Sequence, residues 1–358
     1  MKVVHLLPAL EQGGVETVVC DLVRELGARD QGSGIRWKSV VVSRGGRLVE
    51  KIEAAGGRHI ALDLKSKNPL TYFTRARKLR GILHAEKPDL VCVHSRVPAW
   101  LFVWANRGLG LKWITYAHGA NSVSRYSEVM TKGDLIITPS RFLADYLKAN
   151  YGTPEEKIRV IPNAVDTKRF DPDNLDQAFI AEKRRAWGIR EGDRVLMAIG
   201  RITPVKGLEE LIRNLSSLTS GEDAASPLKL VIVGGADKHH LKYFESLKKL
   251  ASTVHLHLSP SPVVFAGPQE KIPECISIAD EIVSANTTKP ETFGLSVIEA
   301  YAMTKPVRAK RFGGVAEVME AVEKAGKPTL REAVIALYGQ DLQAERTLAA
   351  YREALDMV

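Results

Sequence analysis

Short apolar runs alternate with amphipathic helical patterns along the whole chain. In the first half, the runs predict strands at Val3–Leu7, Lys38–Ser43, His59–Leu62, Leu90–His94, Trp113–Ala117, Leu135–Pro139 and from Ile158 onward. The second half repeats the series at Val195–Gly200, Leu228–Gly234, Val263–Ala266, Glu281–Ala285 and Pro306–Ala309. Because these runs lack polar alternation, they predict strands buried on both faces, as in parallel sheets covered by helices on each side.

The β-α-β-α rhythm predicts an α/β chain with two Rossmann-like, doubly wound parallel sheets. An Asp/Pro/Asn-rich stretch separates the two series, so we predict a first domain over 1–165 and a second over 166–340. We expect residues 341–358 to form a helix that packs back on the first domain. The length of 358 residues agrees with two domains, because a single core rarely grows beyond about 250–300 residues. Open α/β sheets bind ligands at the carboxyl ends of their strands, so we expect a cleft there.

Composition narrows the class of protein. Hydrophobic residues make up 45% and charged residues 26%, which is typical of globular proteins and excludes collagen-like and disordered chains. The three cysteines lie far apart and away from the histidines, so we expect reduced thiols and no zinc site. No apolar run reaches the roughly 18 residues of a membrane-spanning helix, and the N-terminus predicts a first strand rather than a signal peptide. We therefore expect a cytoplasmic protein.

Positive charge is concentrated in the first half of the chain. Residues 1–166 contain 25 basic and 16 acidic residues, whereas residues 167–358 contain 26 of each. The densest basic stretch, 65–80, has apolar residues at helical spacing. It predicts either an amphipathic helix that binds the anionic inner face of a membrane or a solvated helix whose apolar stripe packs on the sheet. Nucleic acid is not an expected partner, because no aromatic residues alternate with the basic ones.

Two glycines follow the first predicted strand and open the first predicted helix. In the segment Gln12–Glu16, Gly13 and Gly14 allow a ligand to approach the backbone, and a helix start favours an anion. An ordinary strand-to-helix turn explains the same residues equally well. The segment is not the G-x-G-x-x-G fingerprint of dinucleotide oxidoreductases, and the one G-x-G, Gly32–Gly34, predicts a loop.

A pair of cations follows the first strand of the second series. Gly200 ends that strand, Arg201 and Lys206 come next, and a predicted helix begins at Leu208. Beside a helix N-terminus, arginine supplies a planar fork and lysine a point charge for a diphosphate. Two solvated loop cations are the alternative interpretation.

A pair of glutamates brackets the start of a later helix. Glu291 precedes the helix and Glu299 lies in its second turn. The backbone N–H groups of Phe293, Gly294 and Leu295 lack helical acceptors and can hold a phosphate. Carboxylates would repel phosphate, so we expect them to bind sugar and ribose hydroxyls instead. A helix cap is the alternative role of Glu291.

Together these motifs resemble the retaining glycosyltransferases of family 4, which have the GT-B fold of two Rossmann-like domains facing a central cleft. The resemblance covers Met1 to about Glu320. It rests on the order of GGVE at 13–16, HG at 118–119, IPNAVDTKRF at 161–170, GRITPVKG at 200–207, the Glu291–Glu299 spacing and GGVAEV at 313–318. The stretch HSRVPAW at 94–100 is similar to members that build lipopolysaccharide or other bacterial surface glycans.

The resemblance implies that the first domain binds the acceptor and reaches the donor with two groups. The backbone of Gly14 would meet the donor's distal phosphate, and Gly13 and Glu16 are further donor-binding positions. His118 would touch the transferred sugar near the reacting centre.

The resemblance also implies that the second domain binds the nucleotide sugar. Arg201 and Lys206 would hold the diphosphate. Glu291 would bind sugar hydroxyls and Glu299 the ribose. The remaining donor-site positions are Gly200, Phe293, Gly294 and Leu295.

No metal ion and no cofactor are implied, because the cations and the helix start would replace a metal beside the nucleotide diphosphate sugar. Asp171-Pro-Asp173 matches a D-x-D spelling, but its position between the domains predicts a turn. The basic run Arg308–Arg311 departs from the family pattern, and we expect it to add positive potential beside the nucleotide.

The implied function is transfer of a hexosyl group to the hydroxyl of a glycan or lipid-linked acceptor. A nucleotide-sugar epimerase or hydrolase of the same fold, and a non-catalytic nucleotide-sugar-binding protein, are the alternatives.

Overall fold

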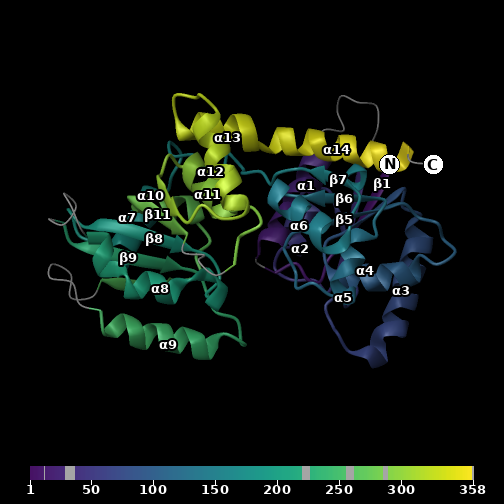
Figure 1. The fold of residues 1–358 in the computed structure, drawn as a ribbon, viewed down its shortest axis with the longest axis horizontal. Helices are drawn as coiled ribbons and strands as arrows, with labels where there is room; N and C mark the ends of the chain where they lie inside the picture. Colours follow the sequence, from purple (N-terminus) through teal and green to yellow (C-terminus); the bar gives the residue numbers. More distant parts are fainter. Residues whose placement is uncertain (12, 29–36, 220–225, 255–261, 285–288, 357–358) are drawn as a thin grey trace. The chain divides into compact units, whose positions relative to one another are not determined.

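The computed structural model describes residues 1–11, 13–28, 37–219, 226–254, 262–284 and 289–356. The chain divides into two compact units: Met1–Ala164 with Gln340–Val358 form the first unit, and Val165–Gly339 form the second unit (Figure 1). Each unit is built on a parallel sheet, so the predicted α/β class with two Rossmann-like sheets is confirmed. The predicted loop at Gly32–Gly34 lies outside the described residues.

The sheet of the first unit has the strand order β3-β2-β1-β4-β5-β6-β7, and every neighbouring pair is parallel. Its strands are β1 (Lys2–Leu6), β2 (Lys38–Ser43), β3 (Arg58–Ala61), β4 (Leu90–Val93), β5 (Trp113–Tyr116), β6 (Leu135–Thr138) and β7 (Ile158–Val160). The central strands β1, β4 and β5 are almost completely buried, because helices cover both faces of the sheet. Their sequences are therefore apolar without alternation.

The helices of the first unit follow its strands in turn. They are α1 (Gly14–Ala28), α2 (Val49–Ala54), α3 (Tyr72–Glu86), α4 (Arg96–Ala105), α5 (Arg125–Glu128), α6 (Arg141–Tyr151) and α14 (Gln340–Asp356), with the short 3-10 turns η2 (Pro69–Thr71), η3 (Val129–Thr131) and η4 (Glu155–Lys157). α4 is the most apolar of the segments between strands and packs Leu101 and Phe102 into the core. Within the described ranges, no helix is long and apolar enough to cross a membrane.

The last helix, α14, completes the core of the first unit. Tyr351 is fully buried, and its hydroxyl lies 2.9 Å from that of Tyr116 at the end of β5. Arg159 Nε donates a hydrogen bond to Glu353 at 2.8 Å. α14, drawn in yellow, runs beside α1 (Figure 1). Residues more than two hundred positions apart therefore share one core.

The second unit has the strand order β10-β9-β8-β11-β12, again parallel. Its strands are β8 (Arg194–Ile199), β9 (Leu228–Val233), β10 (Val263–Gly267), β11 (Glu281–Ser284) and β12 (Val307–Ala309). Its helices are α7 (Gln177–Ala186), α8 (Leu208–Arg213), α9 (Leu241–Ser252), α10 (Ile272–Ile278), α11 (Leu295–Ala302), α12 (Gly314–Lys324) and α13 (Leu330–Tyr338), with the 3-10 turns η5 (Pro204–Lys206) and η6 (Leu215–Thr219).

Successive residues of β8 face two separate cores. Val195 and Met197 pack with α11, α12 and α13, whereas Leu196 and Ala198 pack with α8 and α9 on the other face (Figure 1). Both faces are thus occupied, which leaves the carboxyl end of the sheet for a ligand.

Candidate active site

The carboxyl ends of β8 and β9 approach each other closely in the second unit. Gly200 follows β8 and Gly234 follows β9, and both have φ of 147°. A Cβ on Gly234 would lie 1.8 Å from the carbonyl oxygen of Gly200, so a larger residue requires the backbone to move. The strand ends therefore present backbone rather than side chains where parallel sheets bind ligands.

A pocket with an empty volume of about 350 Å³ opens at this end of the sheet. Its polar lining comes from the β8 end, the β11 end and the first turn of α11: Gly200, Arg201, Lys206, Ser284 and Ser296. Strand residues such as Ala198, Ile232 and Val283 supply its apolar lining.

Two predicted site residues in this region form an ion pair. Lys206 Nζ donates a hydrogen bond to Glu291 Oε1, although 85 positions separate them. Both side chains are partly exposed, at 32% and 17%. Arg201 is exposed at the same pocket and forms no hydrogen bond or ion pair with another described residue. The structure thus brings Arg201, Lys206 and Glu291 to one place.

Glycines hold the Glu291 loop against the start of α11. Gly294 caps the helix with φ of 103°, and a Cβ there would lie 2.9 Å from Val315 Cγ2. Gly314 N donates to the Glu291 carbonyl at 2.8 Å, and a Cβ on Gly314 would lie 2.2 Å from the Thr292 carbonyl oxygen. The GGVAEV segment therefore fixes the loop through close backbone contact.

The other predicted residues of α11 differ in what they can offer a ligand. Phe293 is 4% exposed and packs edge-on against Tyr338, so only its backbone is available. Leu295 is the first helical residue, and Glu299 lies half-buried one turn further on.

In the first unit, the glycine turn stands at the start of α1. Thr17 N donates to the Gly13 carbonyl at 3.0 Å, and Gly14 is exposed. The Glu16 carboxylate folds back over the turn, since a Cβ on Gly13 would lie 2.5 Å from Glu16 Oε2. Gln12 lies outside the described residues.

His118 follows β5 and belongs to a row of three histidines in the first unit. His94 Nδ1 lies 3.1 Å from His118 Nε2, and His94 Nε2 lies 3.1 Å from His5 Nδ1. The rings are stacked, with 5.4 Å between neighbouring centroids. Burial lowers the pKa of His118 to about 4 and that of His5 to about 4. All three imidazoles are therefore neutral at neutral pH.

The sequence analysis did not identify His5 and His94 as site residues. Each is a polar residue in or at the end of an otherwise apolar strand, KVVHL and LVCVH. A buried strand seldom carries an imidazole without a partner, so both interruptions were a usable signal.

Two family models match consecutive parts of the chain. Glycosyltransferase Family 4 matches residues 12–169, and Glycosyl transferases group 1 matches residues 179–328. The chain belongs to glycosyltransferase family 4. The predicted family and its GT-B fold are confirmed.

Family 4 relatives and solved neighbours extend this likeness. A D-inositol 3-phosphate glycosyltransferase of Rhodococcus opacus is 28% identical over 198 residues, which cover 55% of this chain and 42% of the relative. A glycosyltransferase of Rickettsia africae superposes with a TM-score of 0.81 at 24% identity over 100% of this chain and 99% of the other. Anabaena HepE, solved with UDP and glucose, has a TM-score of 0.79 at 17% identity over 98% and 99%. The chain spans less than half the length of the first curated relatives that it matches.

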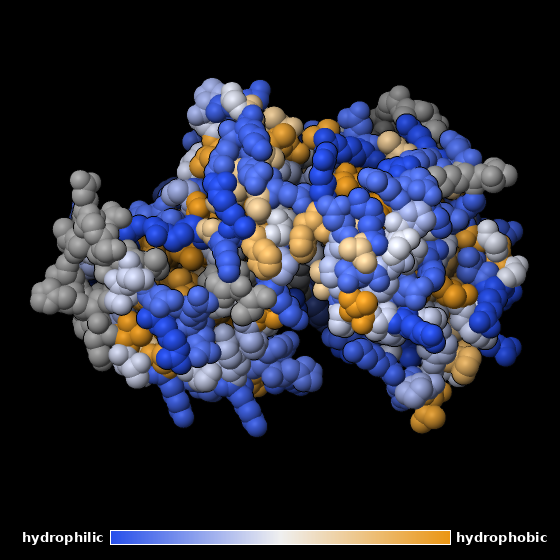
Figure 2. Space-filling model, in the orientation of Figure 1, coloured by the Kyte–Doolittle hydropathy of each residue, from blue (hydrophilic) through white to orange (hydrophobic). Residues whose placement is uncertain are grey.

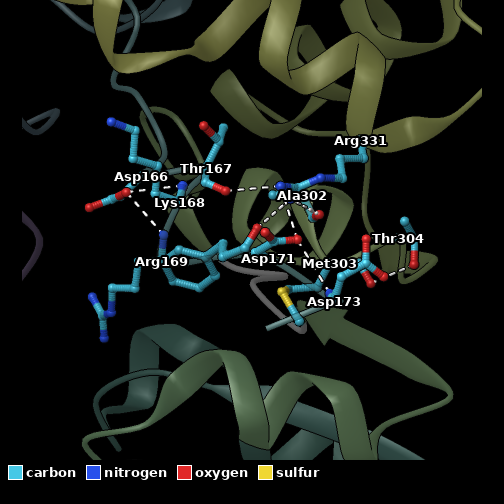
Figure 3. A network of polar contacts seen from close by, with 11 residues as sticks. Asp166, Thr167, Lys168, Arg169, Asp171, Asp173, Ala302, Met303, Thr304 and Arg331 are labelled. Carbon is cyan, nitrogen blue, oxygen red and sulfur yellow. Dashed lines mark hydrogen bonds and ion pairs between the residues drawn. The ribbon is translucent and has the colours of Figure 1, made fainter. Parts of the chain in front are cut away.

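The D-x-D segment of this family 4 chain forms a turn, as its position predicted. Asp171 pairs with Arg331 at 3.4 Å and accepts from the Asp173 backbone N–H at 3.3 Å. Arg331 also donates to the carbonyls of Thr167 and Ala302, at 2.9 and 2.8 Å (Figure 3). Within the described ranges, no group of three or more His, Cys, Asp or Glu side chains could hold a metal ion.

The basic stretch 65–80 is α-helical only from Tyr72, where α3 begins, and its cations are not all on the surface. Arg75 is only 7% exposed and donates hydrogen bonds to the carbonyls of Asp63, Ser66 and Asn68. Arg80 donates to the Ala105 carbonyl at 3.0 Å. These two guanidiniums bind the loop that precedes α3 and the end of α4. The backbone carbonyls replace the water that each cation loses on burial.

Two arginines of the basic run 308–311 form ion pairs within the second unit. Arg308 Nη2 lies 3.0 Å from Glu281 Oε2, and Arg311 Nη1 donates to Glu323 at 2.9 Å. Glu281 also pairs with Arg194, so the expectation of added positive potential beside the nucleotide stays a prediction.

Proposed function

We propose that this family 4 protein transfers a hexosyl group from a nucleotide diphosphate sugar to an acceptor hydroxyl, with retention of configuration and without a metal ion. The observation that carries the donor part is the pocket after β8, where Gly200, Arg201 and Lys206 meet the start of α11. Two cations beside a helix start suit a diphosphate. The UDP bound to HepE supports a nucleotide donor.

The ion pair between Lys206 and Glu291 suggests how the pocket accepts the donor. A diphosphate carries more negative charge than one carboxylate and attracts the Lys206 ammonium. Glu291 is then available to accept a hydrogen bond from a sugar hydroxyl. Arg201, with no partner among the described residues, adds a planar fork to the diphosphate.

In the proposed reaction, the bond from the anomeric carbon to the diphosphate oxygen breaks, and a bond to the acceptor oxygen forms on the same face. The acceptor proton passes to the leaving diphosphate. Arg201 and Lys206 stabilise the charge that develops on this group, often the largest catalytic contribution. His118 is a neutral imidazole because desolvation lowers its pKa. In the proposed reaction it binds the transferred sugar through a hydrogen bond.

The donor assignment is tested by calorimetry with UDP-, GDP- and ADP-sugars in the presence of EDTA. We expect one nucleotide class to bind. Arg201→Ala should weaken its binding by about 10-fold to 100-fold, the equivalent of one charge-assisted hydrogen bond. Arg213→Ala is the matched control, because Arg213 is exposed and pairs with Glu209 on the surface of α8.

Binding that disappears with EDTA would instead require a metal site. Free sugar or an epimer released without an acceptor would identify a hydrolase or an epimerase. Product analysis by proton NMR of the anomeric centre tests retention, and an inverted product would contradict it.

We further propose that the acceptor is anionic or lipid-linked, such as a surface-glycan or lipopolysaccharide precursor, and is met at the inner face of the membrane. D-inositol 3-phosphate, which stands in the name of the Rhodococcus relative, is anionic. Figure 2 shows hydrophobic surface at the tip formed by η2 and the start of α3. There, Leu70 is 87% and Phe73 62% exposed. Arg77 and Lys78 are exposed on the same helix. Apolar side chains among cations suit an anionic lipid surface.

Flotation with anionic and neutral vesicles tests this surface. Arg77→Gln with Lys78→Gln should weaken binding to anionic vesicles by about 2 kcal/mol, since each cation contributes about 1 kcal/mol. Lys38→Gln with Lys51→Gln, which removes two exposed charges elsewhere in the first unit, is the control. Wild-type protein that ignores anionic vesicles at low salt would refute the membrane proposal and leave a dissolved anionic acceptor.

A further inference from the structure

The row of three histidines crosses the first unit at the carboxyl ends of three adjacent strands. His5 lies on β1, His94 directly follows β4, and His118 follows β5. Neighbouring ring nitrogens are 3.1 Å apart at both junctions, which is hydrogen-bond distance. The His94 backbone N–H donates to the Leu6 carbonyl at 3.0 Å and fixes the middle ring in the row.

Each of these imidazoles carries a single ring proton. Burial lowers the pKa of His94 well below its usual value, and the neighbouring His118 and His5 lower it further. A neutral imidazole donates from one nitrogen and accepts at the other. Each 3.1 Å junction needs one donor and one acceptor, so only two arrangements of protons satisfy both junctions.

The inner end of the row discriminates between the two arrangements. His5 Nε2 is buried and has no hydrogen-bond partner within the described part of the chain. In one arrangement this atom carries a buried N–H without an acceptor; in the other it is a lone pair. Orphaned buried N–H groups are rarer than under-satisfied acceptors. His5 therefore carries its proton on Nδ1, which faces His94.

We propose that His5 and His94 are positioning residues that fix His118 in the tautomer with its proton on Nδ1. His5 Nδ1–H donates to His94 Nε2, and His94 Nδ1–H donates to His118 Nε2. His118 Nε2 is then occupied as an acceptor, and Nδ1 offers a hydrogen-bond donor. In this tautomer Nδ1 of His118 can only donate a hydrogen bond, so His118 does not act as a general base through Nδ1. This assignment of a role to His118 rests on the proposed function.

The tautomer is read directly in the full-length protein by long-range proton–nitrogen NMR of ¹⁵N-histidine-labelled samples at neutral pH. Protonated and unprotonated ring nitrogens resonate in separate regions, and His5→Asn and His118→Asn assign the signals. We expect protons on Nδ1 of both His5 and His118. A proton on Nε2 of His118, or on both of its nitrogens, would overturn the proposal.

Variants of His94 add a functional test with an internal rescue. His94→Leu removes the donor to His118 and should lower kcat by about 10-fold to 100-fold, the range for outer partners of an imidazole. His94→Asn places an amide donor near the position of Nδ1 and should restore most of the activity and the His118 tautomer. His59→Asn, a half-buried histidine of β3 bonded to Ser43 outside the row, is the control.

The two proposals fail in different ways. Inactive protein that still shows Nδ1–H on His118 would refute the glycosyltransferase reaction and keep the proton arrangement. Active protein with Nε2–H on His118, or with full activity in His94→Leu, would refute the positioning role alone.

Discussion

The two units place different chemistry at the ends of similar parallel sheets. In the first unit, the strand ends carry neutral, stacked histidines whose pKa values are lowered by burial. In the second unit, they carry glycine backbone and partly exposed ionic side chains, Arg201, Lys206 and Glu291. One architecture therefore provides both an uncharged hydrogen-bonding surface and a charged pocket.

The difference follows from desolvation. Isolated charges buried in a sheet core are costly, whereas exposed charges keep their hydration until a ligand replaces it. A neutral sugar is suited to uncharged hydrogen-bond donors, and a diphosphate is suited to cationic side chains. The contrast makes two predictions. Removing a charged side chain from the second unit should lower the rate of catalysis, and protonating the histidines of the first unit should lower its stability.

The largest effect is expected at Lys206. Lys206→Ala should lower kcat by about 10²–10³, or about 3–4 kcal/mol, because a donor to the developing charge is lost. Lys248→Ala, which breaks a surface pair with Glu245 on α9, should leave kcat unchanged. Steady-state kinetics on both purified variants measures the difference. A near-normal kcat for Lys206→Ala would remove the functional distinction between the units.

Acid should destabilise the first unit before the second. His5 has a folded-state pKa of about 4, below the unfolded value of about 6.5, so the unfolded chain binds more protons between these values. Its contribution of about 3 kcal/mol is complete above pH 6.5 and is lost as pH falls to about 4. In the described part of the second unit, His239 is exposed and His240 partly so.

Hydrogen exchange on the full chain at pH 7, 5.5 and 4.5 distinguishes the units. Protection of β1, β4 and β5 should fall with pH faster than that of β8 and β9. Equal loss in both sheets would contradict the assigned neutral histidines.

A smaller effect is expected from the glycine contact in the second unit. Gly234→Ala should destabilise by about 1–3 kcal/mol, because its Cβ meets the Gly200 carbonyl oxygen and the backbone must move. Gly200→Ala is the matched control, since Gly200 has the same φ of 147° but a Cβ there meets only the Lys206 side chain, with Cε at the ordinary distance of 3.6 Å. Urea unfolding of the two variants isolates the contact. Equal losses would mean that backbone conformation alone matters.

The smallest effect is expected where α14 meets β5. Tyr351→Phe keeps the ring and removes the hydroxyl that pairs with Tyr116, at a cost of about 1 kcal/mol. Tyr146→Phe is the comparison variant. It removes a hydroxyl that donates to the Asn121 carbonyl in a less buried place. A loss of several kcal/mol for Tyr351→Phe would mean that the pair belongs to a larger polar network.

The strands were predictable from the sequence, because central parallel strands such as β8, RVLMAI, are buried on both faces and must be apolar throughout. The glycines and cations after the strands were also found, since their positions follow from chain order. The partners of the cations were not predictable. Arg75 and Arg77 differ by two positions, yet one binds loop carbonyls and the other is exposed.

Contacts between distant segments escaped prediction for the same reason. Nothing local to Lys206 indicates Glu291, and nothing local to His5 indicates His94, because tertiary packing brings these pairs together. A polar interruption of an apolar strand shows that a partner exists but does not identify it.

The return of α14 to the first unit has a consequence for biosynthesis. Residues 165–339 emerge from the ribosome between the first 164 residues and the helix that carries Tyr351. At about 5–20 residues per second, the first unit waits roughly 10 to 35 s without the helix that completes its core. During that interval the apolar surface around Tyr116 and Trp37 is exposed to chaperones and to other nascent chains.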